Sequence, residues 1–480
     1  MNSRWSWNMR AIVSNEIRIE DPTPEVTSWC QRFLVYNNPE YQQMKRLGKE
    51  DIIRWKRIPE KIYLYYYDGR ILVVPYGCLY ALLPAFSRAD CKIYQSFNKA
   101  PDISFKTAKA QGIDEFFDYQ EDAIEAAMAA KSGVIVAGCG SGKTYLGMEL
   151  IRRLGKRALW LCHTGDLLRQ AKDDLLKLYP MAKIGLTTDG KLDIGEDVTI
   201  STVQTMCKID SALYKDKFDV IICDEAAHVC GTPTKLKMFT SVLSKIPARY
   251  KFGLTATPTR ADGLINAMYA YLGANPNGTF SPTYKVDRSR VKTMEAQHLR
   301  VDLDYPLTMR DQMQILDSAG MTDYVKLIPF LCEKQIRNDA IVENIVKCAE
   351  EGRKQIVLSL RVEHCKILVK MLQDRGINAI LCVGETPAKQ REKILKQQVD
   401  WDVIVATYAL LKEGVSIKEL DTLHFCSPAK EKGLIVQCAG RIERYLEGKK
   451  QPLIYDYVDT NIPYCERAYT ERRRALRRRF

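Results

Sequence analysis

The sequence lacks the closely spaced cysteine pairs that bind zinc. Its 15 cysteines include no Cys-x-x-Cys pair, and the closest two, Cys223 and Cys230, are seven residues apart. This spacing argues against a zinc ribbon. Many of the cysteines lie within apolar runs, as Cys162 and Cys382 do. This placement favours buried thiols in a reducing compartment.

A long apolar segment is also missing. The first residues, MNSRWSWNMR, contain no apolar core of the kind found in signal peptides. The most apolar window, residues 71–86, is short and is interrupted by Pro75, Gly77 and Pro84. Such a window predicts a strand and a turn and is too short to span a membrane. We therefore expect a cytoplasmic protein without a membrane partner.

Negative charge is in deficit, since 72 Lys and Arg outnumber 59 Asp and Glu and give a formal net charge of +13. This excess favours an anionic partner, with nucleic acid first and an acidic membrane surface second. A basic surface without a partner is the alternative. The end of the chain, ERAYTERRRALRRRF, is especially rich in arginine. It is interpreted as a phosphate-binding tail, in preference to a solubilising or membrane-bound end.

A length of 480 residues predicts about three domains. Residues 1–108 are expected to form a small accessory α+β domain, because two β-rich runs flank Asp68-Gly69 as in a β-hairpin. Residues 42–57 are basic and are expected to form a helix. This domain is a candidate for duplex DNA binding, although a solvated helix explains the same charges equally well.

From about residue 109 onward, apolar runs typical of strands alternate with helix-like segments. This alternation predicts α/β lobes with parallel sheets covered by helices on both faces. The pattern weakens through residues 275–335 and then resumes. We therefore expect a first lobe at 109–285, a second at 286–460 and the arginine-rich tail at 461–480.

The segment AGCGSGKT follows the first predicted strand of the first lobe. It fits the phosphate-loop pattern except that alanine holds the first position. Its glycines let backbone N–H groups face phosphates, while Lys143 is expected to reach the β- and γ-phosphates and Thr144 to bind Mg²⁺. The nucleotide-binding loop residues are Ala137, Gly138, Cys139, Gly140, Ser141, Gly142, Lys143 and Thr144.

The segment CDEAAH places two carboxylates at the end of another predicted strand. Asp224 is the candidate Mg²⁺ ligand, and Glu225 is the candidate base that positions and deprotonates the attacking water. A solvated strand end is the alternative. This alternative is less favoured, because a phosphate loop lies about 80 residues upstream in the same lobe.

Together with these two motifs, the chain resembles the superfamily 2 helicases. Further matching segments follow in the order found in that family and cover roughly residues 116 to 457: FFDYQEDAIEAA, LCHTGDLLRQ, ISTVQTM, GLTATPTRADG, IVLSLRVEH, VATYALLKEGVSIKELD and QCAGRIER. In layout, the chain is most similar to phage branch-migration and excision-repair DNA helicases. The resemblance implies two RecA-like lobes, ATP and Mg²⁺.

The resemblance also assigns roles to residues outside the phosphate loop. Gln120 is expected to read adenine. Gln437 is expected to sense the γ-phosphate, and Arg441 and Arg444 to act as arginine fingers from one face of a helix. Sugar-phosphate contacts are predicted for Thr164, Gln170, Thr202, Ser359, Arg361 and Thr407.

One position departs from the family pattern. The fourth place of the Asp-Glu box, usually Asp or His, is Ala227, and a histidine follows at His228. In the family this position links the nucleotide site to other motifs. Hydrolysis is therefore expected to survive with rewired coupling, in which either His228 replaces the usual residue or Thr255 and Thr257 bond elsewhere.

The leading hypothesis is a monomeric ATP-dependent DNA helicase or translocase of replication, recombination or repair, and its layout suggests phage origin. An RNA helicase or transcript-release ATPase is one alternative. A nucleotide-gated DNA clamp that does not unwind DNA is another. The fourth hypothesis is that the chain is the motor subunit of a restriction system, but no nuclease motif in the sequence supports it.

Overall fold

The computed structural model describes residues 9–113, 115–138, 140–260, 264–318, 320–412 and 417–477. The chain divides into two compact units, and apart from residues 139–141, which group with the second unit, the change from one to the other falls after Asp287. Each unit is considered by itself below. Among the described residues, no helix combines the length and the apolar character needed to cross a membrane.

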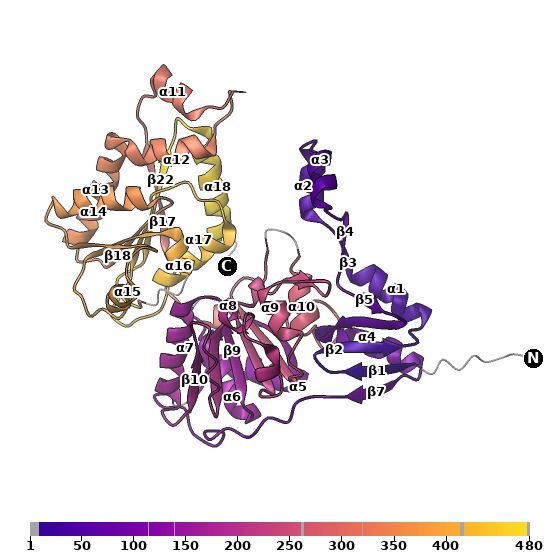
Figure 1. Cartoon of the computed structure of the whole chain (residues 1–480). Coiled ribbons are helices and arrows are strands. Elements are labelled where there is room, and N and C mark those ends of the chain that lie inside the picture. Colours follow the sequence, from indigo (N-terminus) through magenta and orange to yellow (C-terminus); the bar gives the residue numbers. More distant parts are fainter. Residues whose placement is uncertain are drawn as a thin grey trace, which may run out of the picture. The chain divides into compact units, whose positions relative to one another are not determined.

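The first unit begins with a five-stranded sheet in the order β5-β6-β2-β1-β7 (Figure 1). The strands are β1 (Arg10–Val13), β2 (Glu16–Glu20), β5 (Tyr66–Asp68), β6 (Ile71–Pro75) and β7 (Lys92–Gln95). Helices α1 (Pro24–Phe33) and α4 (Leu79–Arg88) contribute buried residues to the same core. The predicted hairpin is confirmed, because β5 and β6 pair in antiparallel fashion on either side of Gly69, whose φ is +61°.

This small sheet does not stand apart from the first lobe. Its core includes Ala267 and Ala270 of helix α10 (Asn266–Leu272), which belongs to that lobe. The backbone of Gly77 approaches α10 so closely that a Cβ atom would lie 2.3 Å from the Tyr269 carbonyl oxygen. Burial of shared apolar surface therefore joins the accessory domain to the first lobe.

The basic segment 42–57 does not form one helix as predicted. It forms the end of α2 (Pro39–Arg46) and all of α3 (Glu50–Lys56), joined by a turn at Gly48, whose φ is +63°. Glycine adopts this left-handed conformation without a steric penalty, so the chain can reverse there. Strands β3 (Val35–Asn37) and β4 (Lys61–Tyr63) pair at the base of the two helices.

The first lobe is built on a seven-stranded sheet in the order β10-β11-β9-β12-β15-β8-β16, with all neighbouring strands parallel. Its strands are β8 (Ser132–Val136), β9 (Ala158–Cys162), β10 (Ile184–Thr187), β11 (Val198–Thr202), β12 (Val220–Asp224), β15 (Tyr250–Thr255) and β16 (Tyr284–Lys285). Five of them match the apolar runs that predict strands in this lobe, GVIVAG, RALWLC, DVTIST, FDVIICD and YKFGLT, whereas β10 and β16 were not predicted. The connecting helices are α5 (Asp118–Ala130), α6 (Lys143–Leu154), α7 (Gly165–Leu178), α8 (Val203–Met206) and α9 (Met238–Leu243).

The second lobe contains a six-stranded parallel sheet in the order β17-β22-β21-β18-β20-β19. Its strands are β17 (Gln297–Leu303), β18 (Gln355–Ser359), β19 (Ala379–Cys382), β20 (Val403–Thr407), β21 (Thr422–Phe425) and β22 (Leu453–Asp459). Its helices are α11 (Met309–Ile315), α12 (Tyr324–Glu333), α13 (Gln335–Glu350), α14 (Val362–Gln373), α15 (Ala388–Leu395), α16 (Tyr408–Lys412), α17 (Lys432–Ile442) and α18 (Pro463–Arg477). These two sheets confirm the predicted α/β architecture of RecA-like lobes beside a small N-terminal sheet.

The interpretation of residues 461–480 as a tail needs correction. Residues 463–477 form helix α18, and Ala475 and Leu476 belong to the core of the second lobe. Arg472 is 1% exposed and binds the buried carboxylate of Asp456 through Nε at 3.0 Å and Nη2 at 2.6 Å. The arginine content of this segment therefore includes an internal ion pair that stabilises the lobe. Residues 478–480 lie outside the described part of the chain.

Candidate nucleotide and nucleic-acid site

The sheet of the first lobe brings the candidate residues to one edge. Strand β8 precedes the phosphate loop, β12 ends at Asp224, and β15, which ends at Thr255, lies between them. All three strands are parallel, so their carboxyl ends meet at the same edge, where ligands bind in open α/β sheets. The end of β9, before His163 and Thr164, adjoins β12 at this edge.

The phosphate loop has the backbone conformation that its glycines predict. Gly140 and Gly142 have φ of +83° and +76°, and α6 begins immediately afterwards at Lys143. The N-terminus of α6 therefore follows the loop directly, as phosphate binding by a helix N-terminus requires. The first position of the phosphate loop is fixed by a backbone hydrogen bond, in which Ala137 N–H donates to the Thr255 carbonyl oxygen at 2.9 Å. Cys139 lies outside the described residues.

Helix α6 lies against the sheet through a glycine. A Cβ atom on Gly147 would come within 2.7 Å of the Trp160 ring and 2.8 Å of a Leu254 methyl group. The absence of a side chain thus lets the helix approach β9 and β15 closely. This close approach fixes the position of Lys143 and Thr144 in the first turn of the helix.

Gln120 lies beside the phosphate loop. It is 6% exposed, and its side-chain Oε1 accepts a hydrogen bond from Phe117 N–H at 3.1 Å at the start of α5. Its Nε2 lies so close to Gly142 that a Cβ there would be only 2.6 Å away. Gln120 therefore packs against Gly142 of the loop, and its predicted contact with adenine stays a prediction.

The two carboxylates differ in setting. Asp224 is 7% exposed at the end of β12, while Glu225 is half-buried in the left-handed region with a φ of +51°. A non-glycine residue in this region is strained, and such strain is concentrated at functional sites. Asp224 Oδ1 accepts a hydrogen bond from Glu225 N–H at 3.0 Å, which fixes the strand end.

The charge of Asp224 also affects the pKa of a neighbouring thiol. Burial first, and then the charge of Asp224, raise the pKa of the Cys162 thiol well above its ordinary value.

Mg²⁺ requires oxygen donors and is commonly held by one or two carboxylates together with substrate phosphates. The Asp224 carboxylate and the Thr144 hydroxyl fit this requirement. Among the described residues, no cluster of three or more His, Cys, Asp or Glu suggests a different metal.

The atypical residue Ala227 is linked to the next motif through its backbone. Arg260 Nη1 donates to the Ala227 carbonyl oxygen at 2.8 Å. The methyl group of Ala226 also leaves little room above β15, since a Cβ on Gly253 would lie 2.7 Å from it. The Asp-Glu box is thus linked to the segment after β15 without a polar side chain at position 227.

His228 contacts a residue that follows β9, and its predicted replacement of the usual fourth residue stays a prediction. Its ring stacks on His163, with 4.4 Å between ring centroids and an angle of 4° between the planes. Gln204 Nε2 in turn donates to the His163 carbonyl oxygen at 2.7 Å.

Thr255 and Thr257 bond to each other, since Thr257 N–H donates to Thr255 Oγ1 at 3.3 Å. Sequence reasoning missed Arg260, His163 and Gln204, although all three lie inside segments that resemble helicase motifs.

Two predicted nucleic-acid contacts of the first lobe act as helix caps. Thr164 Oγ1 accepts Leu167 N–H at 3.4 Å at the start of α7, and Thr202 Oγ1 accepts Thr205 N–H at 3.3 Å at the start of α8. Both hydroxyls lie at the carboxyl edge of the sheet, where the predicted contact remains a prediction. Gln170 is half-buried on α7.

The prediction of a surface contact for Ser359 needs correction. Ser359 is fully buried at the end of β18, and its Oγ lies 2.9 Å from His364 Nδ1. Burial, followed by the charge of Arg337, lowers the pKa of His364 to about 3, so this ring is neutral at pH 7. Ser359 Oγ also accepts Arg361 N–H at 3.2 Å, so the serine positions the backbone of an exposed arginine. Thr407 ends β20 and is half-buried.

The arginine motif of the second lobe is only partly helical. Gln437 and Arg441 lie on α17, but the helix ends at Ile442. Arg444 instead forms a β-bridge with Thr293, which corrects the prediction that both arginines share one helix face.

Buried Glu443 anchors this turn, and its role was not predicted from the sequence. Its carboxylate pairs with Arg288 Nη2 at 2.8 Å and accepts Ala296 N–H at 3.2 Å. Its carbonyl oxygen accepts Met294 N–H at 2.8 Å. The chain that enters the second lobe is thus fixed to the end of the arginine motif.

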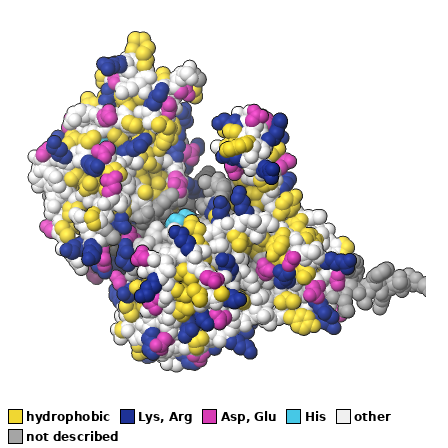
Figure 2. Space-filling view, in the orientation of Figure 1, with side chains coloured by type: hydrophobic (Ala, Val, Ile, Leu, Met, Phe, Trp, Pro, Cys, Tyr) yellow, Lys and Arg dark blue, Asp and Glu magenta, His cyan; other side chains and the backbone are white. Residues whose placement is uncertain are grey.

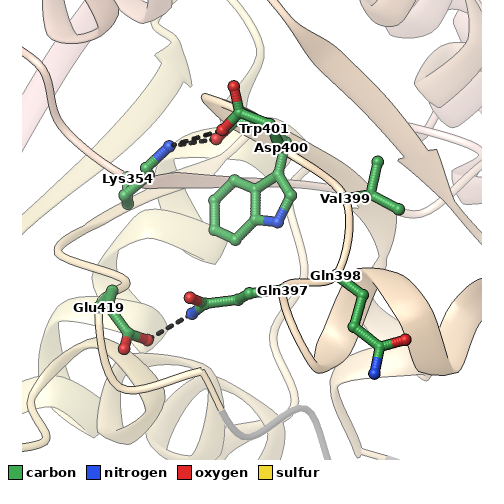
Figure 3. Close-up of a pocket in the computed structure, with 7 residues that line it drawn as sticks. All are labelled: Lys354, Gln397, Gln398, Val399, Asp400, Trp401 and Glu419. Carbon is green, nitrogen blue, oxygen red and sulfur yellow. Dashed lines mark hydrogen bonds and ion pairs between the residues drawn. The ribbon is translucent and has the colours of Figure 1, made fainter.

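A pocket of about 310 Å³ in the second lobe lies apart from these motifs (Figure 3). It is lined by Lys354, Gln397, Gln398, Val399, Asp400, Trp401 and Glu419. Lys354 and Trp401 precede β18 and β20, so the pocket lies at the amino ends of these strands. Four of its polar side chains are paired with one another: Lys354 Nζ lies 3.9 Å from Asp400 Oδ1, and Gln397 Nε2 donates to Glu419 at 2.5 Å. It is not a candidate for the nucleotide site.

Comparison with known proteins gives two family matches. Residues 113–260 match the family described as type III restriction enzyme, res subunit, and residues 337–445 match the helicase conserved C-terminal domain. The first range contains the phosphate loop, the Asp-Glu box and Arg260. The second contains Ser359, Thr407 and the arginine motif.

Individual relatives agree with these matches. The chain is 27% identical over 321 residues to "Probable helicase D10" of Escherichia phage T5, with 66% of each chain covered. It is 32% identical over 373 residues to "DNA 3'-5' translocase XPB2" of Sulfurisphaera tokodaii, with 72% of this chain and 81% of the relative covered. Across the first relatives, the chain spans between 51% and 66% of their length.

Solved structures show the same fold at low identity. Saccharomyces cerevisiae Dbp5, bound to RNA and ADP BeF3, aligns with a TM-score of 0.56 and 12% identity over 76% of this chain and 88% of that one. The family matches, the identity to the archaeal relative and the arrangement of the motifs agree with one another. The chain belongs to the superfamily 2 helicases, a family of ATP-dependent helicases.

Proposed function

We propose that this protein is an ATP-dependent DNA translocase or helicase that remodels duplex or branched DNA. The observation that carries the proposal is the shared carboxyl edge of β8, β15 and β12. This edge brings the phosphate loop and the Asp224–Glu225 pair together and adds a link from the pair to Arg260. The arrangement suits phosphoryl transfer to water, which depends on positioning and charge stabilisation.

Each residue of the first lobe has a distinct part in this proposal. Backbone N–H groups of the loop and Lys143 hold the nucleotide phosphates, while Asp224 and Thr144 hold Mg²⁺. The ion, when bound, neutralises charge that develops on the phosphate oxygens. Glu225 accepts the proton of the attacking water. The proposed γ-phosphate contacts of Gln437, Arg441 and Arg444 rest on the motif alone.

The choice of a nucleic acid rests on charge, and the choice of DNA over RNA rests on several relatives. The formal net charge of +13 favours a polyanion, and the relatives include the phage T4 protein named "ATP-dependent DNA helicase uvsW", at 24% identity. RNA is the second candidate, because another relative is named "Putative ATP-dependent RNA helicase L396", at 25% identity. A clamp that binds DNA without movement is the third candidate.

The test is ATP hydrolysis by the purified protein, measured alone and with single-stranded DNA, duplex DNA, a four-way junction or RNA. We expect branched or duplex DNA to stimulate turnover most, and Glu225→Gln to abolish turnover while nucleotide binding persists. A preference for RNA would replace the proposed substrate. Turnover that no polymer alters would contradict a motor and favour the clamp.

A further inference from the structure

Helices α2 and α3 form a projecting hairpin that contributes nothing to a core. The pair stands out from the N-terminal sheet in Figure 1, and none of its residues is buried. Most short helices in proteins are stabilised by packing an apolar face. A hairpin that buries no residue is therefore not explained by the stability of the domain.

The base of the hairpin is nevertheless well fixed. Asn38 caps α2 by accepting Glu40 N–H at 3.0 Å, and its Nδ2 donates to the Pro59 carbonyl oxygen at 2.8 Å. Lys61 Nζ donates to Asn37 Oδ1 at 2.7 Å across the β3–β4 pair. Asn266 Nδ2 of α10 donates to the Tyr36 hydroxyl at 3.3 Å and connects β3 to the first lobe. These contacts hold the two helices in a defined position.

Basic side chains surround this hairpin. Six are exposed, and within the described parts of the chain none of them forms an ion pair: Lys45, Arg46, Lys49, Arg54, Lys56 and Arg57. Four acidic residues in 39–60 lower the net charge of that segment to +2 (six positive minus four negative). Three of the four, including Glu50 and Asp51, lie in first turns of the helices, where they compensate the helix dipole. Figure 2 shows Lys and Arg around hydrophobic side chains on this projection.

The hydrophobic group that stands out is an indole. Trp55 of α3 is 80% exposed, the highest exposure among the large hydrophobic side chains of the described residues. Tyr63 on β4 is 49% exposed, and its ring lies 5.9 Å from that of Tyr65. Exposed aromatic rings among cations are the combination by which proteins bind single strands, with bases stacking on the rings.

We propose that the α2–α3 hairpin binds nucleic acid where a base is accessible, as at a branch point or a single-stranded end, with Trp55 stacking on that base. The cations bind the adjoining phosphates. A continuous duplex offers no free base face, so the preference is for branched or single-stranded DNA. This inference rests on the proposed function, because it assigns a second contact with the same substrate.

The first test measures the dissociation constant for a labelled four-way junction. Trp55→Ala is expected to weaken binding by about 5- to 100-fold, the effect of losing one base-stacking contact. Trp55→Phe keeps an aromatic face and is expected to retain most of the affinity. Tyr94→Ala is the matched control, because this tyrosine is 52% exposed on β7, at the opposite edge of the same sheet from β5.

The second test measures how binding depends on salt. Replacing Lys45, Arg46 and Lys49 by Gln is expected to lower the slope of log Kd against log salt by about 2 to 3. Replacing Lys177, Lys370 and Lys393, which are exposed on α7, α14 and α15, removes the same charge elsewhere. That control is expected to change the slope by much less.

The outcomes separate the two proposals. A wild-type protein that binds no nucleic acid and hydrolyses ATP without regard to it would overturn the proposed function. If the wild type binds the junction but Trp55→Ala and the charge variant bind it equally well, the function stands and the hairpin proposal is wrong.

Discussion

At the scale of single residues, the departure at Ala227 is accommodated by its backbone. Its carbonyl oxygen accepts Arg260, and the next residue, His228, stacks on His163. One connection runs to the segment after β15 and the other to the segment after β9. A small residue in the fourth place of the box is therefore compatible with coupling.

The ring stack predicts a specific defect. His228→Ala removes the stack on His163, whereas His228→Phe keeps a flat ring in contact with it. Because such ring pairs contribute about 0.5–1.5 kcal/mol, polymer-stimulated ATP turnover is expected to fall about 2- to 10-fold in the alanine variant. Turnover without polymer should change little in both. Equal stimulation of both variants and the wild type would show that the stack carries no coupling.

Lys251 predicts a dependence of stability on pH. This residue is fully buried on β15, its Nζ lies 4.7 Å from the centre of the Tyr76 ring, and burial lowers its pKa to about 7. Between that value and the unfolded pKa of about 10.4, the unfolded state holds a proton that the folded state lacks. The free energy of unfolding should therefore rise with pH across this window.

Lys251→Met removes the group and serves as the comparison. It is expected to stabilise the protein by about 2–4 kcal/mol at pH 7, because an uncharged side chain avoids the cost of deprotonation. The gain should shrink as the pH approaches 10. Urea unfolding at several pH values measures it, and a gain that stays constant with pH would contradict the assigned pKa.

At the scale of elements, sequence patterns predicted the lobe strands with continuous apolar runs and missed β10, β16 and β17, which are partly exposed. Strands β8, β9 and β12 are buried along their whole length and were predicted. Strand β17, at the edge of its sheet, alternates polar and apolar residues in a region that has no clear pattern. Edge strands bury one face or less, so their hydrophobic signal is weak.

Helix α18 shows why charge alone misled the prediction. The arginines of this segment predict a solvent-exposed tail, because the sequence does not reveal that Arg472 faces Asp456. Burial alone would raise the pKa of Asp456, but the Arg472 guanidinium beside it, with a hydrogen bond from His298, holds the pKa below its ordinary value. Similarly, the motifs predicted the nucleotide loop, but Glu443 and the histidine stack depend on contacts distant in sequence.

The buried pair predicts a stability difference between two arginines of the same helix. Arg472→Ala leaves Asp456 buried without its main partner and is expected to cost about 3–5 kcal/mol. Arg474→Ala removes an exposed ion pair with Glu471, at 2.8 Å, and is expected to cost less than about 1 kcal/mol. Chemical unfolding of both variants measures the difference. Similar costs would contradict a structural role for Arg472.

At the scale of the whole molecule, the chain combines two RecA-like lobes with an N-terminal domain that shares a core with the first lobe. The α2–α3 hairpin is anchored through Tyr36 to α10, which follows the segment that contains Arg260. A nucleic-acid contact on the hairpin would thus be made by the same unit that holds the Asp-Glu box and helix α6, which begins at Lys143.

The most direct measurement of the central claim is ATP-dependent remodelling of a labelled four-way DNA junction by the wild type and by Glu225→Gln. The account predicts that the wild type converts the junction to separated duplexes only when ATP and Mg²⁺ are present. It also predicts that Glu225→Gln binds the junction but leaves it intact. Conversion of the junction by Glu225→Gln at the wild-type rate, or no conversion by a wild type that hydrolyses ATP in response to DNA, would contradict the account.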